Sequence, residues 1–183
     1  MRAISRLLLL ALFLSSFVAT AGCDGSSGGS GSGSSGREGG GGSAQTGNSA
    51  TSSEVSLAQQ VLVLVNQERA NVGVGALTMH TGCAQVAYDH SWDMDFRDFF
   101  SHTNPDGATP FDRMHHAGVN YSAAGENIAA GYSTPAAAMA GWMNSAGHRA
   151  NILNANFTEI GIGVREGNTG SYGIYWTQVF RRP

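Results

Sequence analysis

The residue whose side chain is the clearest candidate for chemistry is His148, which lies in the stretch 141–153. Ser145 is a good N-cap for a helix whose apolar end would be Ile152 and Leu153, so we expect His148 in the first turn of that helix. The helix dipole disfavours an imidazolium there and leaves a neutral ring that can bind a metal or accept a proton. The competing interpretation is a histidine that only hydrogen-bonds locally in a capping turn.

Glu126 is the only charged residue between Gly125 and Gly131, a stretch that we expect to form a short strand with close backbone packing at its glycines. If this strand is central in a sheet, the ionised carboxylate needs a cationic or metal partner, because an isolated buried charge costs several kcal/mol. At a sheet edge the carboxylate would simply be solvated. The two positions predict different roles for Glu126.

His102 is the third candidate. It follows an aromatic pair at the exit of an expected helix and precedes a turn built on the Asn-Pro-Asp-Gly sequence at 104–107. His102, Glu126 and His148 each lie near the end of an expected element, where layered folds place their clefts. We therefore expect these three side chains to converge in one cleft.

The positions of three other histidines and one cysteine indicate structural roles for these residues. Cys83 and His90 share an inward-facing stripe on a helix expected over about 82–98. This pattern predicts a small core residue at Cys83 and a hydrogen-bonded core histidine at His90. His115 and His116 are adjacent on a short helix and point about 100° apart, which argues against a shared site.

The periodicity of apolar residues places helices first and strands last. The expected helices cover 54–71 after a capping box at 51–54, then 82–98, about 110–116, a stretch beginning at Pro135, and the helix of His148. Alternation at 160–164 and 174–179, with a turn at 167–170, predicts a terminal antiparallel hairpin. This order has no regular strand-helix-strand rhythm and predicts an α+β layered domain rather than a doubly wound one.

The N-terminus, residues 1–22, is typical of an export signal. It has two arginines, an apolar core over 7–18 and a small-residue cleavage region at 19–22. Gly22-Cys23 resembles the end of a bacterial lipobox, in which Cys23 is lipidated and becomes the mature N-terminus. Thr20 departs from that pattern, since the position usually carries a larger aliphatic residue. We expect a membrane-anchored lipoprotein of the cell envelope, with ordinary secretion as the alternative.

Residues 23–53 are almost wholly glycine, serine and small polar residues, with no apolar group to offset the entropy of ordering them. They predict a flexible tether after Cys23, with a root-mean-square reach on the order of 30 Å. The domain expected at 54–183 carries a formal net charge of −4 and no lysine. That balance excludes nucleic acid as an expected partner.

Six short motifs, in this order along the chain, resemble the CAP superfamily of cysteine-rich secretory proteins, antigen 5 and pathogenesis-related proteins, and in particular its bacterial SCP-domain branch. They are Asn-Gln-Glu-Arg at 66–69, Phe-Phe-Ser-His at 99–102, Gly-Glu-Asn-Ile-Ala at 125–129, the stretch 142–149, Ile-Gly-Ile-Gly at 160–163 and the stretch 175–180. The resemblance covers nearly all of 57–181.

The resemblance implies an α-β-α sandwich with a small antiparallel sheet between helices. It also implies a cleft in which two histidines and two acidic residues face one another, sometimes around a divalent metal. His102, Glu126 and His148 match three of these positions, and Ser145 stands where the family's second acidic residue would be. The neighbouring cleft residues that it implies are Asn127, Ser145 and Arg149.

Two imidazoles and a carboxylate are a plausible ligand set for zinc, with water in the open position. The residues lie 24 and 22 positions apart, so only the resemblance assigns His102, Glu126 and His148 to a metal. The alternative is a metal-free site in which Glu126 bridges the two histidines and raises their pKa values.

Two functions follow. The first is an exported binding domain, anchored to the membrane by a lipid, whose cleft holds a lipid, small-molecule or protein ligand, or a metal, without turnover. The second is a metal-dependent hydrolase, a peptidase or esterase in which a metal-bound water attacks the substrate and Glu126 or a histidine moves the proton. The sequence has no nucleophile elbow and no metalloprotease helix, which favours the binding domain. A purely structural envelope module is a third possibility.

Overall fold

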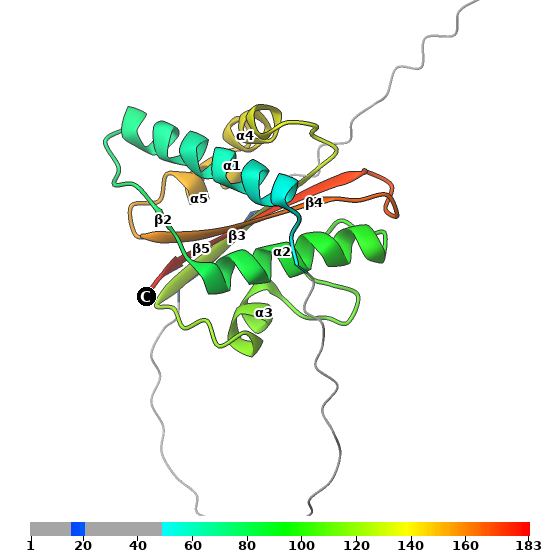
Figure 1. The fold of residues 1–183 in the computed structure, drawn as a ribbon. Coiled ribbons are helices and arrows are strands. Elements are labelled where there is room, and N and C mark those ends of the chain that lie inside the picture. Colours follow the sequence, from blue (N-terminus) through cyan, green and yellow to red (C-terminus); the bar gives the residue numbers. More distant parts are fainter. Residues whose placement is uncertain (1–15, 21–48) are drawn as a thin grey trace, which may run out of the picture.

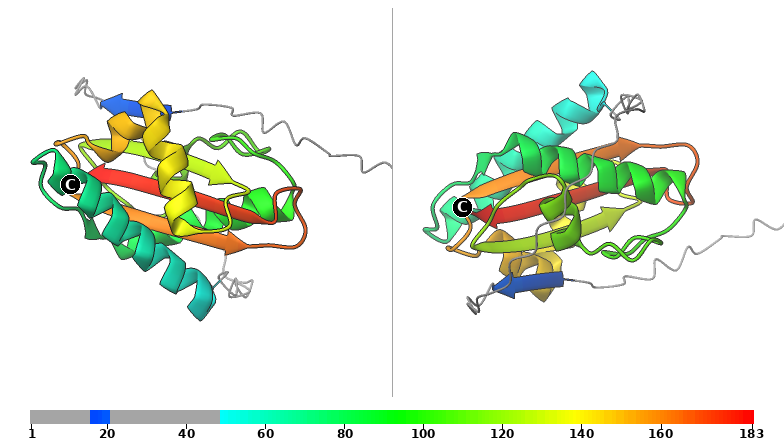
Figure 2. Two further views of the ribbon diagram at one scale, coloured as in Figure 1. Left: turned by 90° about the horizontal axis from the view of Figure 1, so that it is seen from above. Right: turned by 90° about the horizontal axis from the view of Figure 1, so that it is seen from below.

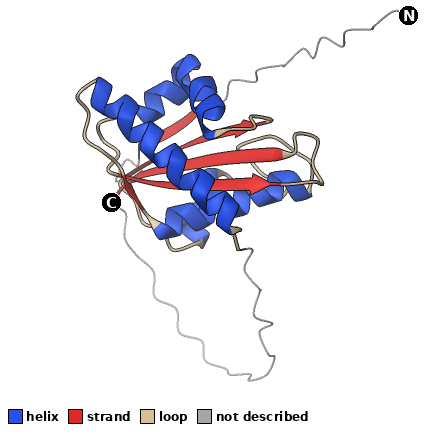
Figure 3. Cartoon of the chain, turned by 45° about the horizontal axis from the view of Figure 1, so that its top comes forward, coloured by secondary structure: helices blue, strands red, loops and turns tan. Residues whose placement is uncertain are grey.

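A five-stranded sheet with helices on both faces forms the core of the computed structural model, which describes residues 16–20 and 49–183 (Figure 1). The strand order is β1-β3-β5-β4-β2. Helices α1, α4 and α5 cover one face, and α2 and α3 cover the other (Figures 1 and 3). The α-β-α sandwich with a small, mostly antiparallel sheet is therefore confirmed.

The helices are α1 (Ser52–Asn71), α2 (Thr81–Phe96), α3 (Pro110–His116), α4 (Pro135–Asn144) and α5 (Ala146–Ile152). The strands are β1 (Ser16–Thr20), β2 (Thr78–Met79), β3 (Ala123–Ala130), β4 (Glu159–Glu166) and β5 (Ile174–Arg182). The expected capping box at Thr51 is present, since the Thr51 side chain accepts from the Glu54 N–H and the Glu54 carboxylate accepts from the Thr51 N–H.

Arg69, in the last turn of α1, joins that helix to the far end of the sandwich. Its guanidinium donates to the carbonyls of Gly75, Ile152, Asn154 and Phe157 at 2.6–3.1 Å. The residue is almost fully buried. Four carbonyl acceptors satisfy a charge that would otherwise be costly to bury, so Arg69 fixes α1 against the loop that follows α5.

Helix α2 lies directly on the backbone of β4, and glycine makes that approach possible. A Cβ atom at Gly161 would lie 2.0 Å from the Cys83 carbonyl carbon, and one at Gly163 would lie 2.1 Å from the Tyr88 amide nitrogen. The alternating Ile160, Ile162 and Val164 side chains join the opposite core beneath α1. The alternation of glycine and branched residues thus gives β4 one flat face and one apolar face.

Two expected boundaries differ from the structure. The strand expected from Gly125 begins at Ala123, so Glu126 lies inside β3 and not at its end. The helix expected to reach Asp98 ends at Phe96, and Asp98 has a φ of 49°. Longer pairing of β3 with β5 explains the first difference, because Ala123 and Ala124 are in register with Arg182 and Arg181.

Cys83 is a free, fully buried thiol, as the helical stripe predicts, and burial raises its pKa to about 11. His90 is also buried. Its Nε2 donates to the Ser101 carbonyl at 3.0 Å, but its Nδ1 has no partner in the described part of the chain, so the prediction of a hydrogen-bonded core histidine is met at one nitrogen. Burial lowers the pKa of His90 to about 4 and keeps the ring neutral.

Strand β1 comes from the segment 1–22 for which the sequence predicts an export signal. It pairs antiparallel with β3, placing Phe17 opposite Glu126 in the register. Removal of the signal would remove this strand as well. Cys23 and the stretch 21–48, which holds most of the predicted tether, lie outside the described residues. Within those that are described, no helix is long and apolar enough to cross a membrane.

The close contact of α2 with β4 makes Gly163→Ala a sensitive probe. We expect this change to destabilise the fold by about 3 kcal/mol, because the new methyl group would overlap the backbone of α2, which cannot move as a flexible side chain could. Gly75→Ala is the matched control, since a Cβ there meets nothing within 4 Å and should change stability by less than about 0.5 kcal/mol. Urea denaturation of both variants measures the difference, and equal effects would contradict this packing.

Candidate functional site

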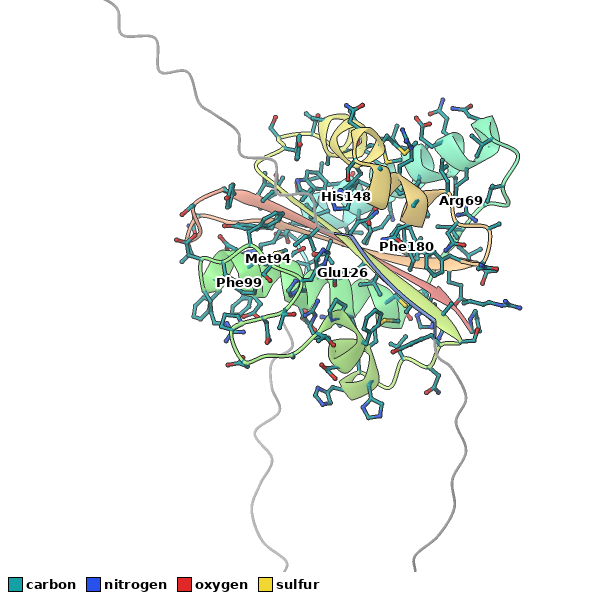
Figure 4. All side chains as sticks on the ribbon, turned by 180° about the vertical axis from the view of Figure 1, so that it is seen from behind. Arg69, Met94, Phe99, Glu126, His148 and Phe180 are labelled. Atoms are coloured by element: carbon teal, nitrogen blue, oxygen red, sulfur yellow. The ribbon has the colours of Figure 1, made fainter. Side chains whose placement is uncertain are left out.

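The centre of the candidate site is the carboxylate of Glu126, which is completely buried in β3. Its Oε1 accepts from His102 Nδ1 at 2.8 Å, and its Oε2 accepts from Arg113 Nη2 at 2.7 Å. Glu126 lies at the level of α2 in Figure 4. The expectation that a buried Glu126 requires a cationic or metal partner is met by Arg113.

Arg113 connects Glu126 to the loop that carries His102. It is carried by α3, which begins at a capping box between Thr109 and Asp112. Its Nη1 donates to the His102 carbonyl at 2.8 Å and to the Ala108 carbonyl at 3.0 Å. Arg113 thereby fixes both the loop that carries His102 and the carboxylate that orients the His102 ring.

The electrostatics keep Glu126 ionised. Burial alone would raise the pKa of this carboxyl, but the hydrogen bond from His102 and the charge of Arg113 outweigh it and hold the pKa below its ordinary value. With an ionised acceptor, the His102 Nδ1 carries the proton of this hydrogen bond. Nε2 is then the ring nitrogen through which His102 can act on a ligand.

His148 belongs to the other layer of the molecule. It lies in α5, is nearly buried, and its N–H faces the Ser145 hydroxyl at 3.5 Å, as the predicted N-cap requires. Figure 4 shows His148 on the opposite side of the sheet from Glu126. Among the described residues the hydrogen-bond partners of the Glu126 carboxylate are His102 and Arg113, so the structure pairs His102 with Glu126 and leaves His148 outside that pair.

Asn127 links the two halves of the site. It follows Glu126 in β3, and its side chain points to the opposite face, where Nδ2 donates to the His148 carbonyl at 3.1 Å and to Gln178 Oε1 at 3.0 Å. Asn151 Nδ2 donates to Asn127 Oδ1 at 2.9 Å and to the Glu126 carbonyl at 3.2 Å. This buried amide network fixes the position of α5, and with it His148, relative to β3.

The other two residues that the resemblance placed beside the site have lesser roles. Ser145 caps α5 as described above, while Arg149 is exposed and donates to the Met143 carbonyl at a long 3.5 Å. Asn127 and Ser145 therefore take part in positioning the site, and Arg149 lies at its surface.

The side chains do not fit a zinc centre in this arrangement. Both oxygens of Glu126 already accept hydrogen bonds, one of them from a guanidinium that would repel a divalent cation. Across residues 16–20 and 49–183, no group of three or more His, Cys, Asp or Glu side chains is placed to hold a metal ion. A metal at Glu126 would have to displace Arg113 or His102.

Sequence reasoning missed Arg113. A usable signal was present, because Arg113 is the only arginine between His102 and Glu126 and lies on a helix that follows the His102 loop. A buried carboxylate that requires a cation, together with one basic candidate nearby in sequence, would have suggested the pair.

The ion pair predicts the effect of Arg113→Met. We expect a loss of about 3–5 kcal/mol in the free energy of unfolding, because the change leaves the buried Glu126 carboxylate without its cation. The double variant Arg113→Met/Glu126→Gln should recover most of this loss, and Arg149→Met, at an exposed arginine, should change little. Urea denaturation at neutral pH provides the measurement. An equal loss in the single and double variants would show that Arg113 acts by packing alone.

Comparison with known proteins identifies the family of the chain. The cysteine-rich secretory protein family, CAP, matches residues 62–180. The uncharacterized protein YkwD of Bacillus subtilis is 42% identical over 135 residues, which are 74% of this chain and 51% of YkwD. The uncharacterized membrane protein YlbC of the same organism is 40% identical over 106 residues, 58% of this chain and 31% of YlbC. The chain thus spans about half or less of the length of these curated relatives.

Solved structures show the same fold. An extracellular SCP-domain protein of Bacillus anthracis superposes with a TM-score of 0.66 at 37% identity, covering 74% of this chain and 45% of that one. An outer surface protein of Borrelia burgdorferi gives a TM-score of 0.64 at 17% identity, covering 73% of this chain and 95% of that one, a likeness of fold alone. From the family match, the close bacterial relatives and the shared sandwich, this chain belongs to the cysteine-rich secretory protein (CAP) family.

Proposed function

We propose that this chain is an exported CAP-domain protein, anchored at the bacterial envelope, whose cleft binds a ligand without turning it over. The observation that carries the proposal is the state of Glu126: both carboxylate oxygens are engaged by Arg113 and His102 inside the protein. A carboxylate held in this way is a structural anion that orients an imidazole. It is poorly placed to act as a general base or to ligate a metal.

The ligand site proposed here lies along the outer edge of β3, with the two histidines on either side of the sheet. His102 approaches from the α2 face, and α5 carries His148 on the other face. Strand β1 pairs with this edge over five residues. If the export signal is removed as the sequence predicts, β1 leaves with it and the edge between the histidines becomes accessible to a ligand.

Export and anchoring rest on separate support. A solved relative that is 37% identical is described as extracellular. The glycine- and serine-rich stretch after Cys23 can hold the domain away from a membrane surface. We propose a lipid on Cys23 as the anchor, with the membrane and an unidentified lipid, small molecule or protein as the partners.

The cleft can be tested by native mass spectrometry of the mature protein released from membranes of the producing cells. We expect a bound species on the wild type that is lost in His102→Ala and in His148→Ala, and retained in His115→Ala, a matched change at an exposed histidine of α3. Ester and peptide probes should be hydrolysed no faster than in buffer.

The same measurement reports the alternative. A mass increment of one zinc ion, lost in both histidine variants and weakened as the pH falls through about 6.5, would show that a metal displaces the Glu126 contacts. Zinc binding accompanied by zinc-dependent hydrolysis that His148→Ala abolishes would overturn the proposal in favour of a hydrolase.

The anchor predicts a second result. Cells grown with labelled fatty acid should incorporate label into the wild-type chain, and Cys23→Ser should remove it, because the thiol of Cys23 is the acceptor in a lipoprotein. Cys83→Ser is the matched control and should keep the label, since Cys83 is buried in the core. Label retained by Cys23→Ser would contradict lipidation and favour ordinary secretion.

A further inference from the structure

The outer edge of β4, on the other side of the sheet from the candidate site, is only partly covered (Figure 2). Strand β2 pairs with β4 for two residues, with Thr78 beside Glu159 and Met79 beside Ile160. The last bond of this pairing runs from the His80 N–H to the Ile160 carbonyl at 2.8 Å. The chain then turns away into α2, and no strand of the described residues lies beside the rest of β4.

The backbone of that uncovered stretch points outward in a regular pattern. The Ile160 carbonyl faces β2, and the Glu166 N–H faces outward to the Glu54 carboxylate at 2.9 Å. Because backbone groups alternate along a strand, the N–H and C=O of Ile162 and Val164 point out of the same edge. No residue in the described ranges hydrogen-bonds to these four groups, although Ile162 and Val164 are almost completely buried.

These groups lie at the bottom of a groove of about 270 Å³ between α1 and α2. Small or apolar side chains dominate its walls, among them Ala50, Val55, Ala58, Met79, Ala84 and Val164. One end is formed by β2. The other is closed by Tyr88, whose hydroxyl reaches from α2 to the Glu54 carboxylate of α1 at 3.4 Å.

We propose that this groove is a strand-addition site for an extended peptide segment of another protein, with small apolar side chains. The peptide would continue the course of β2 for about three residues, roughly 10 Å, and pair with Ile162 and Val164. Its side chains would alternate between the walls formed by α1 and α2.

The chemistry of the groove selects a peptide over an acyl chain. A hydrocarbon would fill the apolar walls but would cover two N–H and two C=O groups without satisfying them, whereas a peptide backbone supplies the matching acceptors and donors. The Glu54 carboxylate makes no demand for a cationic side chain, because it already accepts from Thr51, Glu166 and Tyr88 and lies 3.6 Å from Arg165.

The other sheet edge shows what a satisfied edge looks like in this protein. At β3 the Ile128 carbonyl accepts from Trp142 Nε1 and the Glu126 carbonyl accepts from Asn151 Nδ2, both at 3.2 Å, and β1 adds backbone pairing. The edge of β4 at Ile162 has neither a side-chain donor nor a strand among the described residues. While β1 is in place, the β4 groove is therefore the edge of the described sheet that has room for a further strand.

The experiment is amide hydrogen exchange, followed by NMR on the full chain, with the peptide acetyl-Val-Ala-Val-Ala-Val-amide as the probe. We expect saturating peptide to slow exchange of the Ile162 and Val164 amides at least tenfold and to leave the Gly163 amide, which faces β5, unchanged. Two further peptides of this sequence carry N-methyl groups at alternate residues, one at the odd and one at the even positions, so each lacks a different set of backbone donors. One of the two should protect the Ile162 and Val164 amides less than the other. Palmitate should not protect these amides.

Two valines of α1 provide matched variants. Val55 lines the groove and is 45% exposed, whereas Val63 is 66% exposed on the same helix and lies outside it. We expect Val55→Trp to weaken peptide binding at least tenfold by filling the groove, and Val63→Trp to retain wild-type affinity.

Three outcomes would overturn the proposal. Equal protection by the two N-methylated peptides would show apolar capture without strand pairing. Protection by palmitate would identify an acyl-chain groove. Ile162 and Val164 amides already protected before any peptide is added would show that the chain, or a second copy of it, covers the edge itself.

Discussion

The burial of one negative charge organises the candidate site. Glu126 lies inside β3 with no exposed surface, and an ionised carboxylate in such a place is tolerated only when strong donors surround it. Arg113 and His102 provide these donors from two different segments, so α3 and the loop after α2 are both tied to the central sheet through one side chain. The position of the His102 ring is thus a consequence of how the charge of Glu126 is neutralised.

That arrangement depends in turn on the absence of side chains from the face of β4 on which α2 packs. Gly161 and Gly163 let α2 lie on the backbone of β4, with the hydroxyl of Ser91 donating to the Gly163 carbonyl at 3.1 Å. The end of α2 determines where the His102 loop begins. A side chain at either glycine would push α2 away from the sheet and shift this loop relative to Glu126. Because α2 moves as a rigid helix, the packing at Gly161 and Gly163 in β4 thus affects the position of His102.

Local signals predicted the elements well, because each depends on residues close in sequence. The capping residues Thr51 and Ser145 marked helix starts correctly, and the alternation in the last two strands gave the hairpin. The pairing of His102 with Glu126 came from motif resemblance, and a single sequence contains no distance between them. Arg113 was missed because its partner is determined by tertiary packing. The sequence made no prediction of which face of the sheet α5, with His148, would cover, because the position of a residue in a helix does not specify that face.

The two edges of the sheet offer different kinds of groups to a binding partner. At β3 the Ile128 and Glu126 carbonyls accept from Trp142 and Asn151, and β1 pairs with the backbone of this edge. The ligand site that we propose there adds the side chains of the two histidines. At β4 most wall residues are small or apolar, and among the described residues none hydrogen-bonds to the backbone groups of Ile162 and Val164. A side-chain site discriminates by chemical identity, whereas a backbone edge accepts any extended segment whose side chains fit its walls. The same small sheet can therefore carry, at its two edges, the two different kinds of binding surface that we propose.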